Sequence, residues 1–167
     1  HRSITHYRRL SSTALDLWSR FYKLFEPLEE NIDFYLFQVP PTYVKNDKNT
    51  EKLVKFVKDI GLNGKFAIEF RHESWFNSET VRLCSKLNVT LVSIDSPIAT
   101  WIVRSNGTVY LRMHGRGVWY AYEYNVEELK EIARKIRMLT PKRVYVFFNN
   151  NHWMLDNARM MLKLLKQ

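Results

Sequence analysis

Five short apolar runs, each ending in polar or charged residues, constrain the fold of this chain more than any other feature. Each run has the length of a β-strand and is rich in β-branched and aromatic residues, and stretches of helical periodicity separate one run from the next. The runs cover residues 34–38, 66–72, 90–95, 109–114 and 144–149. This alternation is typical of βαβ units and predicts an α/β fold with a parallel sheet.

The stretches between the runs carry helix boundary signals. They predict helices near residues 13–25, 48–60, 78–88, 125–139 and 153–165. Gly61 suits the left-handed position after a helix, and Ser78 is a suitable N-cap. Asn125 followed by Glu128 resembles a capping box, in which each side chain bonds the backbone N–H of the other. Asn106-Gly107 predicts a turn into the fourth strand.

Composition is that of a globular protein with one core. The chain has 167 residues, of which 46% are hydrophobic and 26% charged. It contains no apolar stretch near the roughly 20 residues needed to span a bilayer, and no signal peptide opens it. Its single cysteine, Cys84, excludes a disulfide framework and a thiolate metal site. We therefore expect a cytoplasmic protein without membrane contact.

The predicted strands do not make a complete closed sheet. Five parallel strands would leave exposed edges, which proteins normally cover, and a (β/α)₈ barrel takes about 250 residues. The chain also begins with His1 rather than Met. We therefore expect residues 1–167 to form a single domain, the C-terminal portion of a (β/α) TIM-barrel-like fold. It would contain about five βα units, with the N-terminal strands absent.

Several short motifs point to one family when they are read in order. They are Ile4-Thr5-His6, Phe37-Gln38-Val39-Pro40, Glu69-Phe70-Arg71-His72 with Ser74-Trp75, Asp95-Ser96-Pro97, Tyr110-Leu111-Arg112-Met113-His114-Gly115 and Phe148-Asn149-Asn150 with Asn157-Ala158. Together they resemble the YecE-like family, domain of unknown function 72. The resemblance implies a TIM-barrel-like fold and two further strands before His1, but no established reaction. Residues 151–154 depart from the family pattern, where smaller residues are expected.

The polar strand ends predict a binding site. Side chains alternate along a strand, and ligands of α/β proteins bind at the carboxyl ends of the strands. If the polar members face the barrel interior, seven side chains converge there: Gln38, Glu69, Arg71, Asp95, Arg112, His114 and Asn149. This set suits acid–base chemistry on an anionic substrate. We assign proton transfer to His114 with Glu69 or Asp95, and charge stabilisation to Arg71 and Arg112.

The loops after the strands add candidate ligand contacts. His114-Gly115-Arg116-Gly117 follows the penultimate strand and Asn149-Asn150-Asn151 follows the last one, where many barrels bind phosphate, and Arg116 could clamp an anion. Aromatic residues in these loops, Trp75 among them, could stack on a sugar or base. The full set of candidate ligand contacts is Gln38, Arg71, His72, Trp75, Arg112, Arg116, Asn149 and Asn150.

Structural roles could account for the same residues. Glu69 could pair with Arg71 or Arg112, and Asp95 with the other arginine, in a closed ion-pair network. His114 could be a core histidine, the loop glycines could serve a tight turn, and the aromatics could pack over the barrel mouth. Mixed carboxylate and imidazole donors suit Mn, Zn or Fe. Nearby arginines and the lack of a local ligand motif argue against a metal, so we assign none and leave the cofactor open.

The net charge of +9 and a pI near 9.7 favour an anionic partner. Many Lys and Arg residues, however, alternate with acids on predicted helix faces, which is typical of solvated surfaces. Three functions remain open. The first is an enzyme acting on a small anionic, phosphate- or sugar-like substrate. The others are a nucleic-acid-binding or nucleic-acid-processing protein and a non-catalytic ligand-binding or interaction protein. The oligomeric state is also open.

Overall fold

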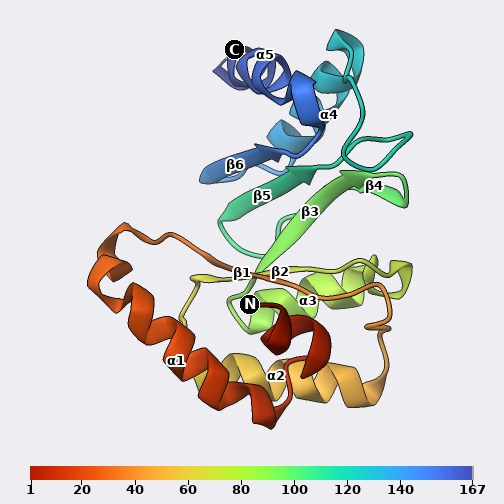
Figure 1. The fold of residues 1–167 in the computed structure, drawn as a ribbon. Coiled ribbons are helices and arrows are strands. Elements are labelled where there is room, and N and C mark those ends of the chain that lie inside the picture. The colour runs from red at the N-terminus through yellow and green to blue at the C-terminus, as the bar shows by residue number, and fades with distance from the viewer. Residues whose placement is uncertain (167) are drawn as a thin grey trace. The chain divides into compact units, whose positions relative to one another are not determined.

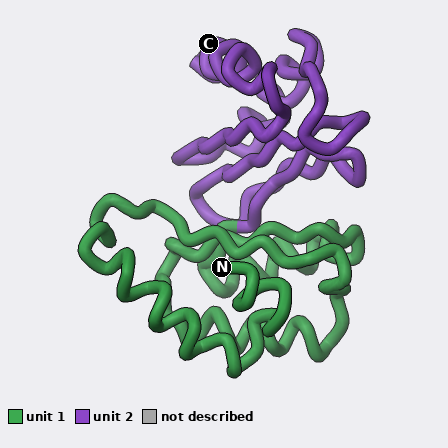
Figure 2. Tube along the Cα trace, in the orientation of Figure 1, with its two compact units in different colours: residues 1–90 green, residues 91–167 purple. Residues whose placement is uncertain are grey.

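The protein alternates parallel strands with helices, as predicted (Figure 1). In the computed structural model, which describes residues 1–166, the chain divides into two compact units. Unit 1 is His1–Thr90 and unit 2 is Leu91–Gln167 (Figure 2). Each unit buries one face of its strands beneath its own helices, so the α/β character predicted from the sequence holds in both.

Unit 1 begins with helical segments and continues with two βα pairs. A π-helical turn at Ser3–Tyr7 and a 3-10 turn at Ser12–Ala14 precede α1. The elements that follow are α1 (Leu15–Phe25), a 3-10 helix (Glu26–Asn31), β1 (Tyr35–Gln38), α2 (Asp47–Ile60), β2 (Phe66–Glu69), a 3-10 turn (Glu73–Trp75) and α3 (Ser78–Lys86).

An aromatic core fixes the direction of the side chains in unit 1. β1 and β2 are parallel, and Phe37 of β1 stacks on Phe66 of β2 with ring centroids 4.2 Å apart. Phe37 also contacts Trp18 of α1 and Phe56 of α2. This face of the strands is therefore covered by helices. Because side chains alternate, the residues between these aromatics lie on the other face.

Unit 2 contains the remaining strands. They are β3 (Thr90–Ser96, starting at the last residue of unit 1), β4 (Ala99–Trp101), β5 (Thr108–Met113) and β6 (Arg143–Phe148). β5 lies between β3 and β6 and is parallel to both. The helices of unit 2 are α4 (Val126–Met138) and α5 (Met154–Lys166), and a 3-10 turn at Asn151–Trp153 precedes α5.

The short strand β4 is absent from the sequence-based prediction. It pairs with β3 in antiparallel fashion, with Ser96 opposite Ala99. Pro97 and Ile98 alone connect the two strands. A strand this short has no readable alternation, and Pro97, in the connection before it, indicated only that β3 ends there.

The core of unit 2 determines which face each polar residue occupies. Val109, Leu111 and Met113 of β5 pack in one buried cluster with residues of α4 and α5. In the β3–β5 register, Asp95 lies beside Met113 and Ile94 lies beside Arg112. Paired residues of neighbouring strands share a face. Asp95 therefore faces the helices, and Arg112 faces the opposite side of the sheet.

Helix ends follow the predicted chemistry with one change. Gly61 has a φ of 60° and caps α2 in the left-handed conformation. Asn125 and Glu128 form the predicted capping box at the start of α4. The N-cap of α3 is Asn77 rather than Ser78, because the Asn77 side chain accepts the bond from the Thr80 N–H. Both residues are good caps, so composition alone did not separate them.

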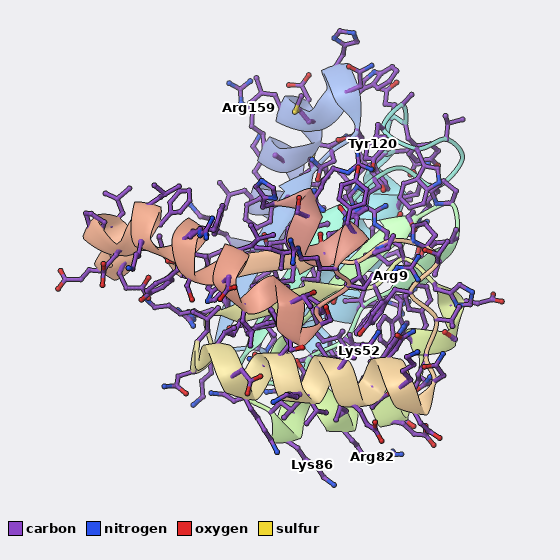
Figure 3. All side chains as sticks on the ribbon, turned by 60° about the horizontal axis from the view of Figure 1, so that its bottom comes forward. Arg9, Lys52, Arg82, Lys86, Tyr120 and Arg159 are labelled. Carbon is purple, nitrogen blue, oxygen red and sulfur yellow. The ribbon has the colours of Figure 1, made fainter. Side chains whose placement is uncertain are left out.

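Basic residues on the outer helices of unit 1 alternate with acidic ones. Figure 3 shows Arg82 and Lys86 projecting from α3 away from the ribbon. On α2, Lys55 pairs with Asp59 at 3.3 Å, and Glu51 adds a further negative charge to this helix. The face is therefore mixed in charge rather than uniformly basic. None of the helices described within residues 1–166 has both the length and the apolar character to cross a membrane.

Candidate functional site

At the carboxyl ends of β1 and β2, unit 1 brings together three of the predicted residues. Glu69 is fully buried and Arg71 is 8% exposed, and the Arg71 Nε lies 2.5 Å from Glu69 Oε1. The Arg71 Nη2 donates to Gln38 Oε1 at 3.3 Å. Gln38 and Glu69 are register partners on the face opposite the aromatic core. The Glu69–Arg71 contact matches one of the ion pairs expected of a structural network.

Trp75, a predicted ligand contact, is instead a core residue. It is fully buried, its indole N–H donates to the Tyr43 carbonyl at 2.7 Å, and its ring stacks on Phe70 with centroids 4.1 Å apart. This bond ties the loop after β2 to the loop after β1. Burial therefore removes the surface that stacking on a ligand would require, so the expected contact is wrong in this structure.

His72, another predicted ligand contact, caps the 3-10 turn that contains Trp75. Its Nδ1 accepts from the Ser74 backbone N–H at 3.2 Å and lies 2.8 Å from the Ser74 hydroxyl. Ser74 in turn accepts from the backbone N–H of Lys45 at 2.8 Å. These bonds give His72 a local role, which is to order the loop after β2.

In unit 2, Arg112 and Asn149 meet at the carboxyl ends of adjacent strands. The Arg112 Nη2 donates to Asn149 Oδ1 at 3.2 Å, and both side chains are half-buried. The face that carries Arg112 also carries Tyr110 and Phe147, whose rings stack with centroids 4.9 Å apart. Phe147 is 43% exposed, so α4 and α5 do not cover this side. The predicted proximity of Arg112 and Asn149 is thus present.

His114 follows β5 directly and is fully buried. Its ring lies 5.5 Å from the rings of both Trp119 and Tyr120, measured between centroids. The backbone N–H of Tyr120 donates to the His114 carbonyl at 2.7 Å, which folds the following loop back over the imidazole. The aromatics of this loop therefore pack on His114, as the alternative interpretation of the loop aromatics proposed.

Asp95 does not share a face with Arg112, and in this respect the expected convergence is wrong. The residue is fully buried, and its carboxylate accepts from the Tyr124 hydroxyl at 2.9 Å and from Thr100 Oγ1 at 2.9 Å. Tyr124 belongs to the cluster that packs β5 against α4 and α5. The phase error arose because β3 is buried on both faces, so its sequence carries no hydrophobic alternation.

Arg116, the expected anion clamp, contacts three carboxylates instead. Its Nε lies 3.1 Å from Asp95 Oδ2, and its Nη1 lies 3.5 Å from Glu128 Oε1 and 3.1 Å from Glu131 Oε2. Burial lowers the pKa of the Arg116 guanidinium. The Asp95 and Glu131 carboxylates together raise this pKa by more than burial lowers it, so the net shift is upward. The positive charge is therefore held by acids of the same unit rather than offered to a ligand.

Asn150 is a further predicted contact that the structure uses internally. The residue is fully buried, and its Nδ2 donates to the Tyr122 carbonyl at 2.8 Å and to Asn157 Oδ1 at 2.7 Å. The Asn157 Nδ2 donates to the Tyr124 carbonyl at 3.0 Å. Sequence reasoning missed this role of Tyr122 and Tyr124. The Asn157-Ala158 motif was the available signal, because a buried asparagine in a helix needs partners.

A metal centre finds no support in the described structure. Within residues 1–166, no group of three or more His, Cys, Asp or Glu side chains is placed to hold an ion. Cys84 is buried in α3, and burial raises the pKa of its thiol to about 12.

The comparisons with known proteins agree on one family. The family model described as "Protein of unknown function DUF72" matches residues 1–167, and the YecE-like name denotes the same family. A DUF72 family protein of Thermotoga maritima is 28% identical with a TM-score of 0.86, covering 100% of this chain and 72% of that one. A DUF72 family protein of Enterococcus faecalis has a TM-score of 0.77 at 23% identity over 89% of this chain and 65% of that one. No curated protein matches the chain.

Proposed function

Since the chain belongs to the DUF72 family, whose description specifies no reaction, we propose a function from its strand ends. In this proposal the protein binds a small anionic, phosphate- or sugar-like ligand at the carboxyl ends of β5 and β6. The observation that carries it is the half-buried Arg112 held beside Asn149 on the face that α4 and α5 leave uncovered.

The chemistry of Arg112 supports an anionic ligand. A guanidinium presents five N–H donors in a planar fork, so it can hold Asn149 and an anion oxygen at the same time. Partial burial strengthens such a charge-assisted bond, because less water competes for the donors. The carboxyl ends of parallel strands are also where α/β proteins place their ligands.

Arg71 and Arg116, the other arginines at strand ends, have carboxylate partners. Arg71 contacts Glu69, and Arg116 contacts Asp95, Glu128 and Glu131. A carboxylate beside a guanidinium weakens the attraction of the guanidinium for an incoming anion. Gln38 and Arg71 remain secondary candidates for ligand contact in unit 1.

For proton transfer, His114 is the residue we propose. It is the first residue after β5, which ends at Met113. Imidazole is the side chain that titrates nearest neutrality. Glu69 and Asp95, also expected to transfer protons, have other partners in this structure. Glu69 pairs with Arg71, and Asp95 accepts bonds from Tyr124, Thr100 and Arg116.

Binding of phosphate and simple phosphate esters, measured by titration calorimetry, tests the proposal. Replacing Arg112 with Met removes the charge and retains much of the side chain's volume. Loss of a charged hydrogen bond corresponds to about 1.5–3 kcal/mol, or roughly a 10- to 150-fold weaker affinity. Arg159→Met is the matched control, because Arg159 is an exposed residue of α5.

Two outcomes would contradict the proposal. Equal phosphate affinity in the wild type and in Arg112→Met would leave Arg112 with a structural role. Tight, salt-dependent binding of single-stranded oligonucleotides that is insensitive to Arg112→Met would favour the nucleic-acid function instead. A ligand that binds through Arg112 but never turns over would favour the non-catalytic alternative.

A further inference from the structure

The 114–124 loop, which connects β5 to α4, is tied at both ends to a single residue of β3. At the start of the loop, the His114 backbone N–H donates to the Asp95 carbonyl at 2.7 Å. At its end, the Tyr124 hydroxyl donates to Asp95 Oδ1 at 2.9 Å. The same hydroxyl accepts from the Gly115 N–H at 2.9 Å, so it joins the two ends of the loop directly.

The second carboxylate oxygen of Asp95 accepts hydrogen bonds from the loop and from β4. Oδ2 accepts from Arg116 Nε at 3.1 Å and from the hydroxyl of Thr100 in β4 at 2.9 Å. Arg116 continues to Glu131 of α4 at 3.1 Å. Asp95 is fully buried, so its charge needs these donors, and the loop supplies most of them.

The loop held in this way covers the imidazole that the proposed function uses. Trp119 and Tyr120, in the middle of the loop, pack on the His114 ring, and His114 has no exposed surface. Tyr120 is 50% exposed, so the side of this ring away from His114 reaches solvent.

We propose that Asp95 is a positioning residue that keeps the 114–124 loop closed over His114, acting through Tyr124 and Arg116. Opening of this closure gives a ligand access to the imidazole. Access of a ligand to His114 rests on the proposed function, whereas closure of the loop does not. The role differs from the proton transfer expected from the sequence, because Asp95 lies on the helix-facing side of β3.

Tyr124 supplies the sharpest test because one atom can be removed from it. Burial is the first cause that raises the pKa of its hydroxyl, and the Asp95 charge adds to it, so the group stays protonated and donates at neutral pH. Tyr124→Phe keeps the ring in the core and removes both loop bonds. Tyr122→Phe is the matched control, because the Tyr122 hydroxyl donates to Glu128 at 2.6 Å and not to Asp95.

Two measurements on the intact chain report closure without any ligand. In hydrogen–deuterium exchange, we expect Tyr124→Phe to exchange the amides of Gly115 and Tyr120 at least tenfold faster, with amides of α4 unchanged. The second measurement is modification of histidines by diethyl pyrocarbonate, located by mass spectrometry. The rate at His114, normalised to the rate at the exposed His152 of the same sample, should be several-fold higher in Tyr124→Phe than in the wild type. Asp95→Asn should give the same pattern, because it weakens the same acceptors.

Equal exchange and equal His114 modification in Tyr124→Phe, Tyr122→Phe and the wild type would overturn the positioning role. Uniformly faster exchange throughout unit 2 in Tyr124→Phe would also overturn it, because that result describes a general loss of stability. Failure of the wild type to bind phosphate would overturn the proposed function while leaving these two readouts in force. The two failures are therefore distinguishable.

Discussion

At the scale of single residues, Gly115 shows how strictly the 114–124 loop is specified. Its φ is +97°, and a Cβ added there would lie 2.5 Å from the Tyr122 Cβ and 2.6 Å from the Val118 carbonyl oxygen. Neither atom is the free end of a flexible side chain, so the backbone must move to relieve the overlap. The glycine therefore serves a turn, which was one interpretation of the Gly115-Arg116-Gly117 sequence.

We predict that Gly115→Ala lowers the free energy of unfolding by at least about 2 kcal/mol, from backbone strain and overlap together. Gly117→Ala is the control, because a Cβ at Gly117 meets only the Tyr122 ring at 3.6 Å. Urea unfolding followed by circular dichroism measures both. Equal midpoints for the two variants would contradict the prediction.

Cys84 supports a second prediction at this scale. Burial raises the pKa of its thiol to about 12, and the side chain has no exposed surface. We expect a thiol reagent such as Ellman's reagent to react with the native protein only through unfolding, so the rate should follow denaturant concentration. Since Cys84 is the single cysteine of the chain, the signal needs no correction. Rapid reaction of the native protein without denaturant would refute this.

At the scale of elements, the start of α4 combines a helix cap with the loop network. Asn125 accepts from the Glu128 N–H at 2.9 Å, and Glu128 Oε2 accepts from the Asn125 N–H at 2.9 Å. Glu128 Oε1 also accepts from Tyr122 and Arg116. One side chain thus connects the helix start with the loop before it, so the helix and the loop stabilise each other.

Asn125→Ala should reduce the free energy of unfolding by about 1 kcal/mol, the usual contribution of an N-cap side chain. Asn125→Asp should retain most of the stability, because a carboxylate accepts the same bond and suits the positive end of the helix dipole. Chemical denaturation of the three proteins at neutral pH distinguishes these cases. If Asp were as destabilising as Ala, the cap would not be the cause.

At the scale of the whole molecule, ionisable groups define the pH range of stability. A hydrogen bond from Lys135 is the main cause that lowers the pKa of Glu131, and a bond from Lys65 does the same for Glu29, both below an ordinary value of 4.5. Burial raises the pKa of Tyr43 and Tyr124 above an ordinary value of 10.0. A carboxylate whose pKa is lowered in the folded state stabilises the protein at higher pH, and this contribution is lost as the pH falls. A tyrosine whose pKa is raised in the folded state stabilises the protein at lower pH, and this contribution is lost as the pH rises.

We therefore predict a plateau of stability between about pH 5 and pH 10, with a decline on either side. Urea midpoints measured across this range test it. On the acid side, Glu131→Gln should flatten part of the decline, and on the alkaline side Tyr124→Phe should do the same. A stability maximum near the pI of 9.7 with a continuous fall toward neutrality would contradict the assignment.

The sequence by itself determined the five parallel strands, the five α-helices and their order, but not the short strand β4. Apolar runs of strand length gave β1, β2, β3, β5 and β6, and capping residues such as Gly61 and Asn125 gave helix ends, because these signals depend on neighbours within a few residues. The contact between Arg112 and Asn149 also followed from the order of parallel strands. Local chemistry was sufficient for the elements, and the pairing of consecutive parallel strands was sufficient for this contact.

Only the tertiary structure decided which face and which partner each polar residue took. Asp95 sits in a strand buried on both sides, where no alternation marks the inner face, and its register against Met113 turned it toward α4 and α5. Trp75 bonds to Tyr43, which lies 32 residues away along the chain, and Arg116 bonds to Asp95, which lies 21 residues away. Such pairings depend on the packing of distant segments, and a buried charge or indole takes whichever partner that packing supplies.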